Sequence, residues 1–390
     1  MTSLRVLAAS ASLLASLADP PSSAPLDVLR LTASTMLEQS SKNITSFFQY
    51  NYGPGYAFSS LYEAAPLRPD LNFTEQLGAY LDLYLQPGAF AYNVSRGVPM
   101  PYTGAVGEPT SFAVAYFARA RDSTDMSVAI QTADVYMLDY PYRLGPSGVF
   151  VRPGGWGSQP GHAFLWGDDQ FMSLALLCRL ARAGAPRAAE YLSVAVANAL
   201  TNARRAQQPG GLFLHGFNTV NNESSCCQWG RANGWIAMSL VELLWALPPP
   251  RASVPVPARG AVLAVFSRLA AGLVRMQDAA DGRWHQVLDE KETFLETSAS
   301  AMFTFALATG VVEGWLPRAD FDAPVRAAWA GLLRAVNSDG TVAGICEGTP
   351  VELDVAAYNS RTTHYNTSDP GLGAVFRAAL AVERFLQAAA

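Results

Sequence analysis

Charged residues are scarce in this chain: only 15% of its 390 residues are Asp, Glu, Lys or Arg, and just two are lysines, Lys42 and Lys291. The 27 basic and 32 acidic residues give a net charge of −5, and the basic residues form no run. Proteins that bind nucleic acid through its phosphates present a basic patch or stripe. The composition therefore argues against a nucleic-acid partner.

Cysteine and histidine are also scarce, with four of each. Four cysteines are too few for a disulfide framework at this length, and their spacing fits no zinc ligand set. In an oxidising compartment one bridge is expected, and it could involve either member of the adjacent pair. The histidines show no metal-ligand spacing, so neither a metal nor another cofactor is expected. The residues concerned are Cys178, Cys226, Cys227, Cys346, His162, His215, His285 and His364.

The sequence lacks an uncharged apolar stretch long enough to span a bilayer, for which about 18 residues are needed. Residues 1–19 instead have the form of a secretion signal. Arg5 gives a short basic start, residues 6–17 are small and apolar, and a polar segment with two prolines follows. The protein is therefore expected to be secreted and extracellular, with no membrane partner.

Five Asn-x-Ser/Thr sequons accompany this signal, and in an exported chain they predict N-glycans. Glycans would also help to keep a surface of low charge soluble. The acceptor residues are Asn43, Asn72, Asn93, Asn222 and Asn366.

Apolar residues recur at helical spacing through most of the chain, and the loops between them are rich in Gly, Pro, Asn and aromatic residues. No segment alternates over enough residues to predict a sheet. The pattern predicts an all-α protein in which residues 20–390 form one domain, with residues 248–250 as a stiff proline turn. A closed ring of helical hairpins would bury each apolar stripe and gather the loops at one end. The expected helices are 26–37, 74–85, 111–121, 126–138, 170–183, 188–205, 232–247, 258–276, 298–309, 324–336 and 372–388.

The most informative segment runs from His162 to Met172, where a loop gives way to an apolar helix. Trp166 stands two residues before the acidic pair Asp168 and Asp169. A carboxylate beside an indole ring offers an acid–base group next to a surface on which a sugar can stack. Taken alone, either Asp is more simply explained as the N-cap of the following helix.

Three further junctions between loop and helix combine aromatic, basic and acidic residues, at 211–218, 228–235 and 283–300. Singly, each has a structural explanation: a satisfied loop histidine, core tryptophans, a paired arginine or serines that start a helix. Together they place Trp, Arg, His and Asp at helix starts. Arg binds a carboxylate through two parallel hydrogen bonds, and Asp or His transfers protons. The four junctions therefore predict a pocket for an acidic sugar.

Three motifs, in this order, resemble those of the unsaturated rhamnogalacturonyl hydrolases of glycoside hydrolase family 105, which are related to the unsaturated glucuronyl hydrolases of family 88. The similarity covers about residues 150–385. It implies an (α/α)6 barrel of six helical hairpins. It also implies an enzyme that hydrates the C4=C5 double bond of a terminal unsaturated uronic acid, on pectic rhamnogalacturonan oligosaccharides left by a lyase. The motifs are Trp166-x-Asp168-Asp169-x-Phe171-Met172, Trp229-Gly-Arg231-Ala-Asn233-Gly-Trp235 and Trp284-His-Gln286-Val-Leu-Asp289.

The resemblance also implies roles for individual residues. Asp168 would be the catalytic acid and base, protonating C4 and then activating the water that attacks C5. The N-terminal third lacks a clear match to the motif of the family's second acidic residue, and Glu108, just before a helix, is the best-placed candidate. Asn218 stands where the family usually has an Asp. The expected substrate-binding residues are Trp166, His215, Trp229, Arg231, Trp235 and His162.

The ionisation of Asp168 is subject to opposing influences. A helix N-terminus stabilises a carboxylate anion. Burial against Trp166 and repulsion from Asp169 would both favour the neutral acid. Because the first step needs the acid form, an acidic pH optimum is expected.

Two other functions fit parts of the same pattern. An endo-α-1,6-mannanase-like hydrolase shares the helical barrel and an adjacent Asp pair, but it gives Arg231 no evident role. A non-catalytic oligosaccharide-binding protein would keep the aromatic pocket, and the substitution at Asn218 leaves room for it. Activity on saturated mannan, or tight binding without turnover, would identify them. The chain is expected to act as a monomer.

Overall fold

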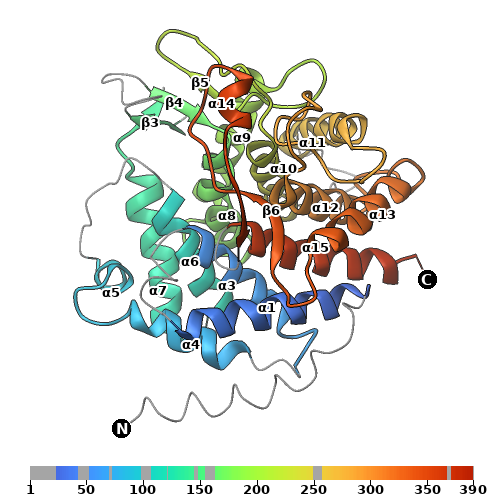
Figure 1. Cartoon of the computed structure of the whole chain (residues 1–390). Coiled ribbons are helices and arrows are strands. Elements are labelled where there is room, and N and C mark those ends of the chain that lie inside the picture. Colours follow the sequence, from blue (N-terminus) through green and yellow to red (C-terminus); the bar gives the residue numbers. More distant parts are fainter. Residues whose placement is uncertain are drawn as a thin grey trace.

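The computed structural model describes residues 23–42, 52–69, 73–97, 107–120, 122–144, 148–153, 163–248, 257–366 and 370–389 (Figure 1). Helices make up most of these ranges, and the strands are short. The expected secretion signal at residues 1–19 lies outside the described residues.

Six helices of the described chain form a closed inner ring. Neighbours contact one another in the order α3, α6, α8, α10, α12, α15 and back to α3. The last helix of the chain thus closes the ring against the first of its members. The inner helices are α3 (Tyr52–Ala64), α6 (Gly107–Arg119), α8 (Asp168–Arg182), α10 (Gly230–Ala246), α12 (Thr297–Val312) and α15 (Pro370–Gln387).

A second layer of helices covers this ring from outside. Helix α4 contacts α3, α7 contacts α6, α9 contacts α8, α11 contacts α10, α13 contacts α12 and α1 contacts α15. Outer and inner helices alternate along the chain, which confirms the all-α class and the (α/α)6 barrel of six hairpins. The outer helices are α1 (Pro25–Lys42), α4 (Phe73–Leu83), α7 (Ser123–Thr132), α9 (Ala188–Ala206), α11 (Pro257–Met276) and α13 (Arg318–Ala335).

The apolar pattern explains which helices lie inside. Every residue from 230 to 244 in α10 and from 297 to 311 in α12 is buried. A helix that is apolar on all sides is stable only when other elements surround it. Helix α9 instead buries one stripe and exposes the rest, as expected for the outer layer. Its buried residues are Tyr191, Ala195, Asn198, Ala199, Asn202, Ala203 and Ala206.

Helix α3 is absent from the helices that the sequence pattern predicts. Its first turn contains Gly53, Pro54 and Gly55, which normally indicate a turn. Proline is tolerated there because the first N–H groups of a helix have no partner within it. The expected helix 126–138 is also divided, since α7 passes into a π-helix, η2 (Ala133–Leu138). Two short helices, α5 (Phe90–Ser95) and α14 (Val355–Asn359), were likewise not predicted.

Three small antiparallel sheets connect the helices, and each strand has only two to five residues, too few for an alternating pattern to predict. The sheet β3–β4–β5 and helix α14 lie together at the top of Figure 1. Strand β4 leads directly into α8, so this end of the barrel holds the start of that helix. The strands are β1 (Arg143–Leu144), β2 (Val149–Phe150), β3 (Arg152–Pro153), β4 (Ala163–Trp166), β5 (Gly216–Asn218), β6 (Val342–Cys346) and β7 (Thr363–Asn366).

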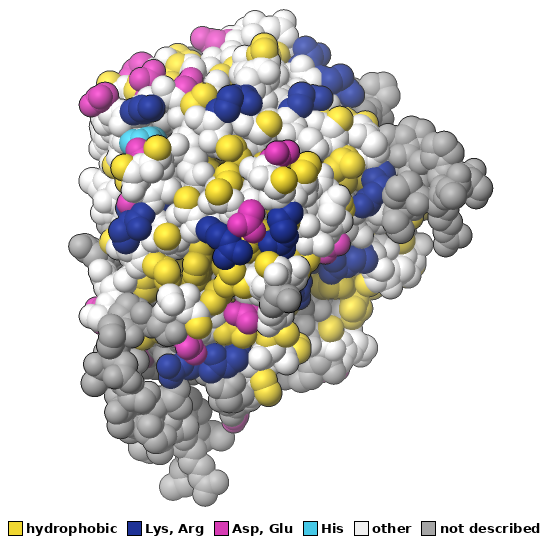
Figure 2. Space-filling model, turned by 90° about the vertical axis from the view of Figure 1, so that its right-hand side faces the viewer, with side chains coloured by type: hydrophobic (Ala, Val, Ile, Leu, Met, Phe, Trp, Pro, Cys, Tyr) yellow, Lys and Arg dark blue, Asp and Glu magenta, His cyan; other side chains and the backbone are white. Residues whose placement is uncertain are grey.

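The surface agrees with the low charge of the sequence. On the face shown in Figure 2, basic and acidic side chains are interspersed with apolar and neutral ones. Among the described helices, none combines the length and the apolar character needed to cross a bilayer.

Candidate functional site

Asp168 lies in the first turn of α8, directly after strand β4. Gly167 occupies the N-cap position, and no side chain caps the helix there. The simpler explanation of Asp168 or Asp169 as an N-cap is therefore wrong. The Asp168 side chain is 17% exposed and lies at the end of the barrel.

A close approach between two helices requires glycine at position 167. A Cβ atom there would come within 2.9 Å of the Ala232 side chain on α10 and 3.4 Å of the His215 carbonyl oxygen. The Gly167 amide also donates a hydrogen bond of 2.9 Å to that carbonyl. The absence of a side chain thus lets the start of α8 lie against α10 and the His215 segment.

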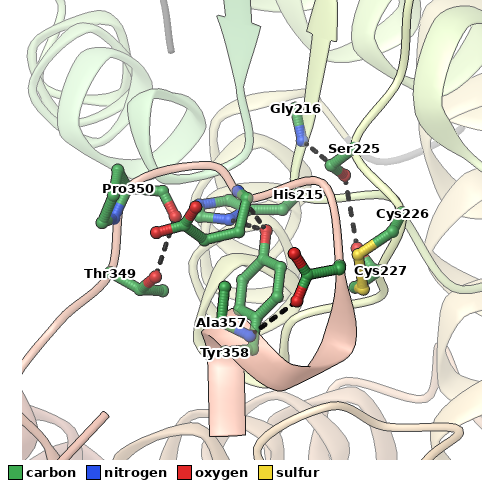
Figure 3. Close-up of a disulfide and its surroundings, with 11 residues drawn as sticks. His215, Gly216, Ser225, Cys226, Cys227, Thr349, Pro350, Ala357 and Tyr358 are labelled. Carbon is green, nitrogen blue, oxygen red and sulfur yellow. Dashed lines mark hydrogen bonds between the residues drawn. A yellow bond between two sulfur atoms is a disulfide. The ribbon is translucent and has the colours of Figure 1, made fainter. Parts of the chain in front are cut away.

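Strand pairing brings His215 beside Asp168. Trp166 on β4 pairs with Gly216 on β5, so the residue before Gly216 lies next to the start of α8. The His215 Nε2 atom is 3.1 Å from Asp168 Oδ2, and its Nδ1 atom is 2.7 Å from the Tyr358 hydroxyl. The structure therefore unites two residues that the sequence predicted for the site. It adds Tyr358, which belongs to no predicted motif (Figure 3).

The start of α10 supplies the next part of the site. The Trp229 ring lies 4.5 Å from the His215 ring, centre to centre, and the Arg231 guanidinium lies 4.9 Å from the Trp229 ring centre. Arg231 donates hydrogen bonds to the Cys346 carbonyl at 2.7 Å and to Ser298 Oγ at 3.4 Å. Trp229 and Arg231 are both 1% exposed. In this structure Trp229 therefore supports His215 and Arg231 and presents no open face to a sugar.

Arg152 on β3 belongs to the site and was missed in the sequence. Its guanidinium lies 3.9 Å from the centre of the Trp166 ring and forms two hydrogen bonds of 2.7 Å to the Asp169 carboxylate. One face of Trp166 is therefore covered by a cation. No motif surrounds Arg152, and only the pairing of β3 with β4 brings it here.

The pKa of Asp168 lies below its ordinary value of 3.8. Burial raises this pKa, but the hydrogen bond from His215 lowers it. The charges of Arg152 and Arg231 lower it further, so the free site holds Asp168 as the anion. Repulsion from Asp169 is not among the main influences on this pKa, and the Asp169 carboxylate is paired with Arg152.

The remaining predicted residues have other positions. Trp235 lies in the core, with its ring 5.2 Å from Phe171 and 5.3 Å from Tyr56. Glu108 falls in the first turn of α6, but its side chain lies outside what the structure describes. His162 also lies outside the described residues. The roles of these three residues stay predictions.

Asn218 has a structural explanation. Its side-chain oxygen accepts a hydrogen bond of 3.0 Å from the Val220 amide, and its own amide donates to the Glu223 carbonyl at 2.7 Å. An Asn side chain stabilises a tight turn in this way. The residue is buried at the base of the turn, and the departure from the family pattern therefore agrees with the local fold.

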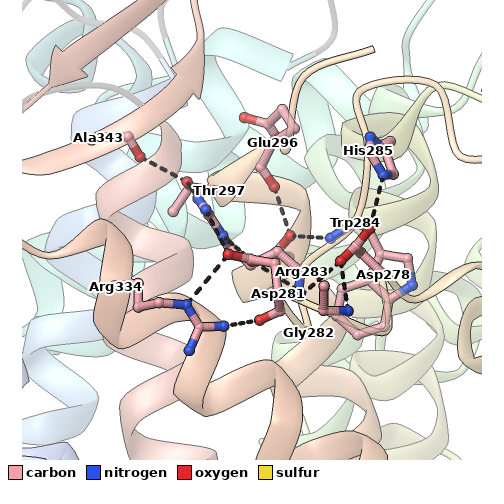
Figure 4. Close-up of polar contacts among 12 residues, drawn as sticks. Asp278, Asp281, Gly282, Arg283, Trp284, His285, Glu296, Thr297, Arg334 and Ala343 are labelled. Atoms are coloured by element: carbon pink, nitrogen blue, oxygen red, sulfur yellow. Dashed lines mark hydrogen bonds and ion pairs between the residues drawn. The ribbon is translucent and has the colours of Figure 1, made fainter. Parts of the chain in front are cut away.

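The junction at 283–300 forms a separate polar cluster (Figure 4). Arg283 pairs with Asp281 at 2.7 Å, and Ser300 Oγ accepts from the Trp284 amide. His285 lies 3.4 Å from Asp278, not beside Asp168. Glu296 is the N-cap of α12 and accepts from the amides of residues 298 and 299. This junction therefore orders the end of the barrel, and it also borders the site. Ser298 accepts a hydrogen bond from Arg231, and Gln286 donates one to the Tyr358 carbonyl.

Cys226 and Cys227 form a disulfide between adjacent residues, while Cys178 and Cys346 are free and buried. The single bridge that the sequence predicted is thus found within the adjacent pair. The Cys227 carbonyl accepts a hydrogen bond of 3.1 Å from the His215 amide (Figure 3). The bridge therefore lies next to the backbone that carries His215.

The fold is shared with solved structures of low sequence identity. A possible member of the GH105 family from Salmonella enterica superimposes with a TM-score of 0.77 at 17% identity, covering 94% of this chain and 95% of that one. An unsaturated glucuronyl hydrolase from Bacillus sp. GL1 gives a TM-score of 0.62 at 16% identity, covering 92% and 95%. At this identity the likeness establishes the barrel.

Sequence comparison extends the likeness. The unsaturated rhamnogalacturonyl hydrolase YesR of Bacillus subtilis is 33% identical over 148 residues, which are 38% of this chain and 39% of that protein. An unsaturated 3S-rhamnoglycuronyl hydrolase of Formosa agariphila is 34% identical over 116 residues, or 29% of each chain. These matches thus span less than half the length of the curated relatives. The profile of Glycosyl Hydrolase Family 88 matches residues 28–386, nearly the whole chain, and the protein belongs to that family.

Proposed function

We propose that this protein is an unsaturated uronyl hydrolase that acts on lyase-generated pectic oligosaccharides of the rhamnogalacturonan type. The observation that carries the proposal is the Asp168–His215 pair, with a distance of 3.1 Å, set between the cations Arg152 and Arg231. Two sequence relatives are named as hydrolases of unsaturated rhamnoglycuronyl or rhamnogalacturonyl substrates. A negatively charged sugar suits a site in which arginines surround one acid–base group.

Asp168 serves both steps of the proposed reaction. As an acid it delivers a proton to C4 of the vinyl ether, and positive charge develops at C5 and the ring oxygen. As a base it then takes a proton from the water that attacks C5. The resulting hemiketal opens and the remaining oligosaccharide leaves. One carboxylate suffices, so the spacing of paired glycosidase carboxylates does not constrain this site.

The low pKa of Asp168 in the free site requires that the substrate supplies the conditions for protonation. A uronate that enters brings a second negative charge close to Arg152 and Arg231 and excludes water. Both effects raise the pKa of a nearby carboxyl group. Asp168 therefore takes up a proton as the substrate binds, and binding and protonation are coupled.

This coupling predicts a specific pH dependence. Because Asp168 is ionised in the free protein above its pKa, which lies below the ordinary value of 3.8, kcat/KM falls about tenfold for each pH unit above that pKa. The value of kcat, which reports the bound state, declines only at higher pH. A kcat/KM that stays level from about pH 5 to 7 would contradict the assignment of Asp168 as the acid.

We further propose that the protein is extracellular, glycosylated and monomeric. Asn222, one of the five sequon residues, is exposed at the tip of the turn between residues 218 and 225, where an oligosaccharide meets no obstacle. Mass spectrometry before and after glycosidase treatment of the exported protein tests the glycans. Light scattering of the purified chain tests the monomer.

The deciding experiment follows the ultraviolet absorbance of the conjugated double bond during incubation with lyase-digested rhamnogalacturonan. The wild type removes this absorbance, whereas Asp168→Asn does not. Asp278→Asn is a matched control, because Asp278 also pairs with a histidine but lies outside the site. No decay on this digest or on lyase-treated glucuronans would reject the proposal. Turnover of saturated mannan, or binding without turnover, would then identify the alternatives.

A further inference from the structure

Tyr358 contacts His215 on the side of the imidazole ring opposite Asp168. Its hydroxyl is 2.7 Å from His215 Nδ1, while His215 Nε2 is 3.1 Å from Asp168 Oδ2. Figure 3 shows the Tyr358 hydroxyl directed at the His215 ring. Tyr358 and His215 are fully buried, so water does not compete for these contacts. The three residues come from α14, the loop before β5 and α8.

The direction of the hydrogen bonds follows from a second contact of Tyr358. The Glu352 amide donates a hydrogen bond of 3.1 Å to the phenol oxygen. That oxygen therefore already acts as an acceptor, and its own proton is available for the nitrogen of His215. Burial raises the pKa of Tyr358, which keeps this proton on the phenol at neutral pH.

Asp168 imposes the same direction from the other side. Its carboxylate is an acceptor without a proton in the free site, so the atom that faces it must be a donor. The donor is His215 Nε2, which therefore carries a hydrogen. In neutral imidazole the other nitrogen then has a lone pair, and Tyr358 is the residue that donates to it.

We propose that Tyr358 is a positioning residue that donates its hydroxyl hydrogen bond to His215 Nδ1 and so fixes the neutral tautomer whose Nε2–H donates to Asp168. This inference deepens the proposed function, on which its kinetic part rests. Tyr358 touches no reacting atom. It holds the ring in the state that stabilises the Asp168 carboxylate without adding a full positive charge beside it.

Among the groups around His215, Tyr358 is the one that sets the tautomer of the imidazole ring. The ionisable groups near the pair are Asp168 on α8, Arg152 on β3 and Arg231 on α10, with Glu352 near the phenol. The arginines carry fixed charges over the working pH range. Without the Tyr358 hydroxyl, Nδ1 loses its donor in a buried place and takes up a proton more readily. The imidazolium that results would hold Asp168 as an anion and oppose its protonation by the substrate.

Nitrogen NMR of the histidine rings tests the tautomer without any substrate. The chain has four histidines, so the signals of 15N-histidine-labelled protein are few, and His215→Gln assigns those of His215. At about pH 8, where free histidine is neutral, we expect Nε2 protonated and Nδ1 unprotonated in the wild type. The opposite tautomer, or a doubly protonated ring, would overturn the proposal. This outcome is independent of whether the protein hydrolyses unsaturated sugars.

Tyr358→Phe removes the hydroxyl alone. We expect the Nδ1 signal of His215 to move toward the protonated position, and kcat to fall about tenfold with KM little changed. Tyr116→Phe is the matched control, because Tyr116 is equally buried and its hydroxyl donates to the Leu81 carbonyl at 2.6 Å, in another part of the barrel. Unchanged His215 signals and an unchanged kcat in Tyr358→Phe would also overturn the proposal. If this variant fails to fold, the wild-type tautomer alone decides.

Discussion

Helix α8 carries a charged cluster toward each of its ends, and the two clusters differ in how their charges are paired. Toward its C-terminal end, Arg179 lies 2.7 Å from Glu63 and also pairs with Glu242. Arg377 on α15 pairs with the same two carboxylates, at 2.6 Å and 3.2 Å. Each arginine thus contacts each carboxylate group, and the cluster is closed on itself.

The cluster at the start of α8 is arranged differently. Arg152 binds the Asp169 carboxylate, and Arg231 binds a backbone carbonyl and a serine. Both arginines also lower the pKa of Asp168. Arginines and carboxylates that bind one another stabilise the fold, whereas cations near a partly exposed carboxylate suit an anionic ligand. The comparison therefore separates a structural network from a candidate binding site on one helix.

The largest effect is expected in the closed cluster. Glu242→Ala leaves two buried arginines with one shared partner, and the free energy of unfolding should fall by about 3–5 kcal/mol. Urea denaturation measures this loss. Glu190→Ala is the control, because Glu190 pairs with Arg187 on the surface and its loss should cost less than about 1 kcal/mol. Equal losses in the two variants would remove the distinction between a closed and a surface pair.

The next largest effect is expected for Arg231. Arg231→Ala should raise KM about 100-fold with a smaller change in kcat, because the negatively charged substrate loses the attraction of a nearby buried cation. Steady-state kinetics on the folded variant measures this. Arg283→Ala removes an arginine from the neighbouring cluster of Figure 4 and should leave KM unchanged. A KM within about twofold of the wild type would place the carboxylate elsewhere.

A smaller effect is expected for Arg152. Arg152→Met removes one cation and leaves the Asp169 charge unpaired, and both changes raise the pKa of Asp168. The fall in kcat/KM should therefore begin at a higher pH than in the wild type. Arg182→Met also removes an arginine from a tryptophan face, that of Trp245, and should leave the profile in place. An unshifted profile in Arg152→Met would show that Arg152 does not act on Asp168.

The smallest effect is expected for the disulfide. Replacing both Cys226 and Cys227 by Ser should change the free energy of unfolding by less than about 1 kcal/mol, because a bond between adjacent residues restricts few conformations of the unfolded chain. Hydrogen bonds from several segments hold the His215 backbone in any case. Thermal unfolding and the rate of the absorbance assay measure the outcome. An inactive double variant would show that the bridge itself holds the site.

The helical barrel could be predicted because apolar spacing repeats in nearly every helix. Helix α3 could not, since Gly53, Pro54 and Gly55 hide its first turn. The strands could not be predicted from the sequence for a different reason. They are stabilised by pairing between segments far apart, and two to five residues carry too little pattern of their own.

The residues of the candidate site likewise fall into those that the sequence predicted and those that it did not. Asp168, Trp229 and Arg231 stand in motifs at helix starts, and His215 stands in a motif that leads into strand β5 instead of a helix. The structure brings all four together. Arg152 and Tyr358 stand in no motif. They reach the site only through the pairing of β3 with β4 and the course of the chain around α14, which depend on tertiary contacts. The balance of influences on the ionisation of Asp168 could not be settled from the sequence for the same reason, because Arg152, the partner of Asp169, was not visible there.

Closure of the ring by α15 has a consequence for the timing of folding. This helix packs between α12 and α3, and it also contacts α1, so segments more than 300 residues apart must meet. Such distant contacts form slowly, since a long loop must close before any contact is gained. During synthesis, the apolar faces of the N-terminal hairpins that α15 will cover therefore remain exposed until the C-terminal helix has been made. Uncovered apolar faces of this kind make a partly folded chain prone to aggregation.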